Sequence, residues 1–119
     1  NKIICMQNYK EERPWGTFEV LYVDEHCKIK KIVVNPGQRL SLQYHSKRDE
    51  HWYVIEGVGL VTAGDNTWSI KKGLSTNILR LIPHRITNSG SENLTFIEVQ
   101  TGTYFGEDDI ERVEDDYGR

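Results

Sequence analysis

Short runs of alternating apolar and polar residues, separated by turn-forming residues, recur along the chain. This pattern predicts β-strands at residues 18–23, 28–34, 40–45, 51–56, 59–63, 67–70, 74–82, 85–88 and 94–101. Short segments rich in glycine, asparagine, proline or lysine are expected to form turns between these strands, at residues 35–37, 64–66, 71–73 and 88–90. No run of ten or more residues has a strong helical period. We therefore expect an all-β sandwich or barrel, formed by one domain over residues 1–119.

The strand expected at residues 40–45 separates two kinds of side chain. Its even-numbered positions are leucine or tyrosine, whereas Gln43 and His45 share the opposite face because alternate residues of a strand point the same way. Glu50 follows at a turn's distance, and His84 begins a later apolar stretch. Two imidazoles, a carboxylate and an amide oxygen are suitable ligands for a divalent metal. The alternative is a barrel without a metal, in which these groups only hydrogen-bond with one another.

The spacing of these residues is more specific than their types. It reads G-x5-Q-x-H-x4-E-x6-G over residues 37–57 and G-x10-H-x3-N over residues 73–88. Both halves resemble the two motifs of the cupin superfamily, whose matched positions are usually His, His, Glu and His. The resemblance implies a jelly-roll barrel, the double-stranded β-helix, with a metal held by Gln43, His45, Glu50 and His84. Zinc is the expected ion, and cobalt, manganese, nickel or iron would also suit these ligands.

Longer segments resemble a narrower family. They are RPWGTFEVL (13–21), PGQRLSLQYH (36–45), EHW (50–52), PHRITN (83–88) and GEDDIERVEDDYGR (106–119). These segments are similar to the C-terminal domain of type II mannose-6-phosphate isomerases, which in many members follows a mannose-1-phosphate guanylyltransferase domain. The resemblance implies a metal-dependent enzyme that interconverts mannose-6-phosphate and fructose-6-phosphate. The chain has no glycine-rich segment that would cradle a nucleotide phosphate, so no guanylyltransferase activity is expected of it.

Five residues are expected to bind the sugar phosphate or to transfer its proton. Arg39 and Arg85 lie in segments that match the family, and Lys30 lies on a neighbouring strand. Their positive charges suit a phosphate group, which arginine can bind with two hydrogen bonds. Isomerisation also needs a base that reaches the proton on C2. Glu98 is one candidate, unless it is an ordinary outward-facing carboxylate, and Glu50 as both ligand and base is another.

Departures from the family pattern leave other functions open. Family members often carry a run of histidines where His45 is followed by Ser46 and Lys47, and Leu79 and Leu81 occupy positions where the second motif usually has Pro and Gly. One alternative is a cupin that binds a sugar phosphate or regulates without catalysis. Another is a different metal-dependent cupin enzyme, such as a dioxygenase or a sugar-nucleotide epimerase. The RPWG and EDDYGR segments argue against this last alternative.

The net charge of −3 is unevenly distributed along the chain. Residues 106–119 form an acidic C-terminal tail with seven acids and two bases, a net charge of −5, and the remainder carries +2. This balance argues against a nucleic-acid partner. The tail is either a solvated face or folds back on the barrel and brings Tyr117 or Arg119 near the site.

Composition also bounds the cellular setting. No run approaches the ~20 apolar residues of a membrane span, and no leader is seen, so the sequence predicts a cytoplasmic protein without a membrane partner. Cys5 and Cys27 lack the spacing of a metal finger and are expected to be reduced thiols. Residues 1–12 are expected to be an N-terminal extension. A homodimer is expected because cupins commonly pair through their sheet edges.

Overall fold

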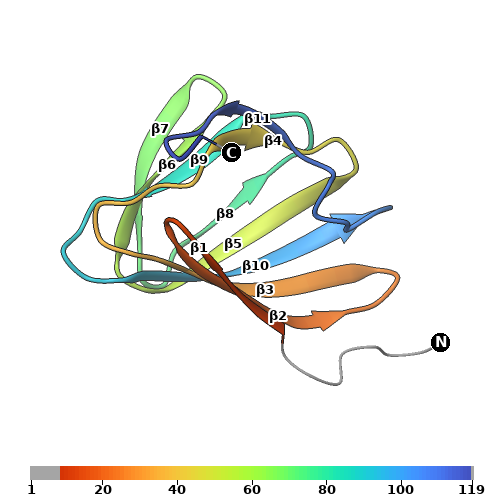
Figure 1. Cartoon of the computed structure of the whole chain (residues 1–119), viewed down its shortest axis with the longest axis horizontal. Helices are drawn as coiled ribbons and strands as arrows, with labels where there is room; N and C mark the ends of the chain where they lie inside the picture. Colours follow the sequence, from red (N-terminus) through yellow and green to blue (C-terminus); the bar gives the residue numbers. More distant parts are fainter. Residues whose placement is uncertain (1–8, 119) are drawn as a thin grey trace.

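The computed structural model describes residues 9–118, which form eleven strands in two antiparallel sheets. The six-stranded sheet has the order β1 (Tyr9–Arg13), β2 (Gly16–Val23), β3 (Cys27–Val34), β10 (Leu94–Gly102), β5 (Arg48–Glu56) and β8 (Ser75–Ile78). The five-stranded sheet has the order β11 (Glu111–Glu114), β4 (Leu42–Tyr44), β9 (His84–Asn88), β6 (Val58–Ala63) and β7 (Asn66–Lys71). The two sheets curve around a common interior (Figure 1). The all-β prediction is confirmed.

The interior is formed by alternate residues of the strands. In β3, Lys30, Ile32 and Val34 are all buried, which confirms that they share one face. Trp52 of β5 and Phe96 of β10 pack against each other in the centre of the core, with ring centroids 5.1 Å apart. β10 lies between β3 and β5, although it follows them by more than thirty residues in the chain. Strands distant in sequence therefore meet and close the barrel.

All nine predicted strands occur, but several boundaries differ from the prediction. The strand expected at residues 74–82 ends at Ile78, because the Arg80 amide donates to the Asp49 carboxylate and the Leu81 amide donates to the His45 carbonyl. These bonds draw the chain out of the sheet ladder and leave Leu81 with a φ of 70°. The strand expected at residues 40–45 is regular only over residues 42–44.

Two short strands, β1 and β11, were not predicted. β1 pairs with β2, so residues 9–12 of the expected extension belong to the six-stranded sheet. Cys5 and the rest of that extension lie outside the described residues. β11 pairs with β4, so the acidic tail folds back on the barrel (dark blue in Figure 1). We call residues 106–118 the C-terminal segment. Within it Tyr117 packs against the core and its hydroxyl bonds to Gln38, whereas Arg119 lies outside the described residues.

Within residues 9–118 the structure contains no helix long and apolar enough to cross a membrane.

Candidate metal centre and substrate cavity

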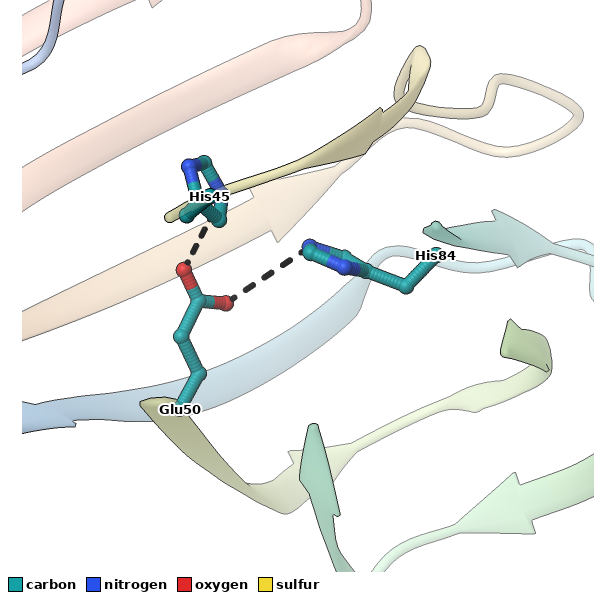
Figure 2. A group of neighbouring side chains, drawn as sticks. All are labelled: His45, Glu50 and His84. Atoms are coloured by element: carbon teal, nitrogen blue, oxygen red, sulfur yellow. Dashed lines mark ion pairs between the residues drawn. The ribbon is translucent and has the colours of Figure 1, made fainter. Parts of the chain in front are cut away.

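Three of the four predicted metal ligands meet inside the barrel. His45 follows β4, Glu50 lies on β5 and His84 begins β9, and all three side chains are buried. One potential ligand atom from each lies within 4.8 Å of the other two (Figure 2). The Glu50 carboxylate is 3.3 Å from His45 Nε2 and 4.0 Å from His84 Nε2. The fourth predicted ligand, Gln43, is paired with His84 across the sheet and lines the same cavity.

Hydrogen bonds to the backbone orient both imidazoles. His45 Nδ1 lies 2.6 Å from the Asp109 carbonyl oxygen, and His84 Nδ1 lies 2.9 Å from the Ile82 carbonyl oxygen. A carbonyl can only accept, so each Nδ1 carries a proton and each Nε2 is the ring nitrogen that faces Glu50. Burial lowers the pKa of His45, which favours its neutral form. The donor set therefore fits a divalent metal, whose histidine ligands commonly have such backbone partners.

Arg48 is a member of this cluster that the sequence analysis did not select. Its guanidinium lies 2.8 Å from Glu50 Oε2 and 3.2 Å from His45 Nε2. Burial alone would raise the pKa of Glu50, but Arg48, together with His84 and His45, outweighs that effect and lowers it to about 2. The sequence spacing could have identified Arg48. It stands two residues before Glu50 on β5, so the two side chains share the inward face of that strand.

The cluster opens into a cavity of about 160 Å³ between the sheets. Glu98 of β10 lies on its wall and is buried, with Gln100 Nε2 donating to its carboxylate. Burial, with the nearby charge of Glu50, raises the pKa of Glu98 to about 7 even though Lys30 and Arg48 act in the opposite direction. This side chain therefore faces inward and changes protonation state near neutral pH.

The structure brings two of the three predicted phosphate-binding residues to the cavity. Lys30 and Arg85 line it and are buried. Lys30 Nζ is 2.8 Å from the Glu107 carboxylate, and Arg85 Nε donates to the Leu40 carbonyl at 2.9 Å. Arg39 does not line the cavity, because its guanidinium makes two hydrogen bonds, of 2.7 and 2.9 Å, to Asp116 of the C-terminal segment.

Three buried polar atoms of cavity-lining residues have no hydrogen-bond partner within the described part of the chain. They are Ser41 Oγ, Arg48 Nη1 and Arg85 Nη2. Buried polar groups are almost always paired, so these atoms are available to a polar ligand or to water. The lining side chains comprise five cations (Arg13, Lys30, Arg48, Arg85 and Arg112) and three carboxylates (Glu50, Glu98 and Glu107). The cavity therefore has a formal excess of two positive charges in a chain whose net charge is −3.

Solved structures with the same architecture identify the fold. The chain matches oxalate decarboxylase from Bacillus subtilis with a TM-score of 0.82 and 20% identity, over 95% of this chain and 32% of that one. It matches a Klebsiella pneumoniae protein with a double-stranded beta-helix domain with a TM-score of 0.71 and 22% identity, over 80% and 81% of the two chains. These likenesses establish the fold, which confirms the prediction of a cupin-type double-stranded β-helix.

The sequence comparisons then establish the family. The family model described as "Mannose-6-phosphate isomerase C-terminal" matches residues 2–115, and the chain belongs to this family. The alginate biosynthesis protein AlgA of Pseudomonas aeruginosa is 47% identical over 95% of this chain and 24% of its own length. A mannose-1-phosphate guanylyltransferase of Salmonella muenchen is 39% identical over 86% of this chain and 22% of its own length. The chain thus spans about a quarter of the length of the curated relatives it matches.

Proposed function

We propose that this domain interconverts mannose-6-phosphate and fructose-6-phosphate, using a divalent metal held by Gln43, His45, Glu50 and His84. The observation that carries the proposal is the buried cluster of two imidazoles and a carboxylate at the wall of a cavity whose lining has a formal excess of positive charge. Membership of the mannose-6-phosphate isomerase C-terminal family supplies the substrate class. Zinc is the ion we expect, because this set of nitrogen and oxygen ligands suits it.

The reaction moves a proton between C2 and C1 of the open-chain sugar. The metal would polarise the carbonyl group and stabilise the negative charge that develops on its oxygen. Glu98 is the residue we assign as the base, since a pKa of about 7 lets it accept a proton and return it near neutral pH. Glu50 remains a carboxylate because its pKa is about 2, so we assign it to metal binding rather than to proton transfer.

The cavity also suits the phosphate group of the substrate. The unpartnered Nη2 atom of Arg85 and the unpartnered Ser41 hydroxyl are donors that phosphate oxygens can accept from. The formal excess of positive charge among the lining residues favours an anionic substrate. We assign Arg85 a direct contact, with Lys30 supporting the wall through Glu107. Arg39 would act indirectly, by holding the C-terminal segment through Asp116.

A reconstitution assay tests the proposal. The chain is stripped of metal, reloaded separately with zinc, cobalt or manganese, and given mannose-6-phosphate, with fructose-6-phosphate measured by a coupled reaction. We expect turnover that disappears with chelator and in Glu50→Ala, while Lys72→Ala, which removes an exposed cation from a turn, behaves as the original chain. Thermal stabilisation by mannose-6-phosphate without turnover under any metal would instead identify a non-catalytic sugar-phosphate-binding cupin.

A further inference from the structure

Arg112 of the C-terminal segment lies in one row with two of the proposed metal ligands. In the five-stranded sheet Arg112 of β11 pairs with Gln43 of β4, which pairs in turn with His84 of β9. Directly paired residues of antiparallel strands point to the same face, and all three residues line the cavity. Since neighbouring strands are roughly 4.8 Å apart, the backbone of Arg112 lies roughly 10 Å from that of His84.

Arg112 differs from every other cation on the cavity wall. The other four each have a carboxylate partner, in the pairs Arg13–Glu11, Lys30–Glu107, Arg48–Glu50 and Arg85–Glu114. The guanidinium of Arg112 makes no ion pair or hydrogen bond with any residue between 9 and 118, and this residue is exposed. Its charge is therefore free to meet a ligand at the edge of the cavity.

The C-terminal segment is fixed by its own acidic residues, so the position of Arg112 is defined before any ligand arrives. The Asp109 carboxylate accepts from the amides of Ser46 and Lys47 at 3.1 and 3.0 Å. The Asp116 carboxylate binds Arg39, and Glu114 lies 3.4 Å from Arg85. These contacts join the segment on both sides of Arg112 to the loops and strands around the cavity.

We propose that Arg112 binds the phosphate of the sugar phosphate and thereby selects phosphorylated over unphosphorylated sugars. This inference rests on the proposed function for the identity of the sugar. The carbonyl end of an open-chain hexose phosphate would lie at His45, Glu50 and His84, and the phosphate would reach Arg112, because the row across the sheet is comparable in length to such a molecule. A guanidinium can donate two parallel hydrogen bonds to a phosphate group.

The test is a binding measurement on the metal-loaded full chain, with turnover recorded separately. Arg112→Gln is titrated calorimetrically with mannose-6-phosphate and with mannose. We expect binding of mannose-6-phosphate to weaken about 10- to 100-fold, as for loss of one charged hydrogen-bonding group, with no change for mannose. Arg112→Lys should recover part of the loss, and KM should rise while kcat changes little. Lys72→Gln is the matched control, because it removes an exposed charge outside the cavity lining.

The outcomes separate this inference from the proposed function. Unchanged mannose-6-phosphate binding in Arg112→Gln, or an equal loss of mannose binding, would overturn the role of Arg112 even if the original chain is an active isomerase. If the original chain binds mannose-6-phosphate selectively but never converts it, the isomerase proposal fails while the selective loss in Arg112→Gln still supports the phosphate contact. No binding of mannose-6-phosphate by the original chain would overturn both.

Discussion

Replacing Glu98 with glutamine should change how the stability of the barrel depends on pH. In the folded protein the pKa of Glu98 is raised to about 7 from an ordinary value of 4.5, chiefly by burial and then by the charge of Glu50. Folding therefore binds a proton at this site between those two pH values. The stability that Glu98 contributes is fully present below the lower value and is lost as pH rises through about 7. At about 1.4 kcal/mol for each pH unit, the loss amounts to about 3 kcal/mol.

Urea unfolding of the metal-free protein measures this effect. Free energies of unfolding are determined for the original chain and for Glu98→Gln from about pH 4 to about pH 8. Glutamine keeps the size of the side chain but does not titrate, so the variant should gain about 3 kcal/mol relative to the original chain across this range. The lowered pKa of His45 gives a slope of opposite sign, but it is present in both proteins and cancels in the difference.

The same variant tests the role of Glu98 in the reaction. Turnover by the original chain should rise as pH passes through about 7 and Glu98 ionises, and Glu98→Gln should be inactive throughout. A difference in unfolding free energy that stays constant with pH would show that the pKa of Glu98 is ordinary. The argument that burial prepares this carboxylate for proton transfer would then be refuted, whatever the activity of the variant.

Two further substitutions test the metal cluster and the loop beside it. Glu50→Gln should abolish tight cobalt binding in a spectroscopic titration. It should also destabilise the metal-free protein by about 3–5 kcal/mol, because it leaves the buried Arg48 without its partner. Unchanged cobalt affinity would contradict the proposed ligand set. Leu81→Gly should be about 1–2 kcal/mol more stable to urea unfolding than Leu79→Gly, because Leu81 is held at a φ of 70°. The two leucines are about equally exposed, at 59% and 60%, so Leu79→Gly is the matched control. Equal midpoints of urea unfolding for the two variants would contradict this prediction.

The strands and the positions of the candidate metal ligands could be predicted because both depend on local spacing in the sequence. Alternation in β3 placed Lys30, Ile32 and Val34 on one face, and the structure buries all three. The two motif spacings selected His45, Glu50 and His84, whose ligand atoms meet in the interior. In each case the period of the strand or the length of a turn determines where the side chain points, so the sequence carries the information directly.

The positions of the residues expected to bind phosphate were harder to predict because the directions of their side chains depend on distant partners. Arg39 lies within the first motif, but the chain there is irregular, with only an isolated bridge to Thr87. Its guanidinium therefore turns to Asp116, 77 residues later, and away from the cavity. Arg48 differs from Arg39, because its side-chain direction does follow from local spacing. It stands two residues before Glu50 on the same strand, and this spacing predicts that both side chains share one face.

The C-terminal segment shows why total charge is a poor guide to the chemistry of this barrel. The net charge of −5 over residues 106–119 is typical of a solvated tail, and the four exposed residues of β11 carry no alternating pattern. Glu107, Asp109, Glu114 and Asp116 nevertheless each bond to a residue far away in the sequence, and together they fix the segment against the barrel. Because these acids are engaged, their negative charge does not cancel that of Arg112, and an acidic segment can supply the free cation that we propose for binding an anionic substrate.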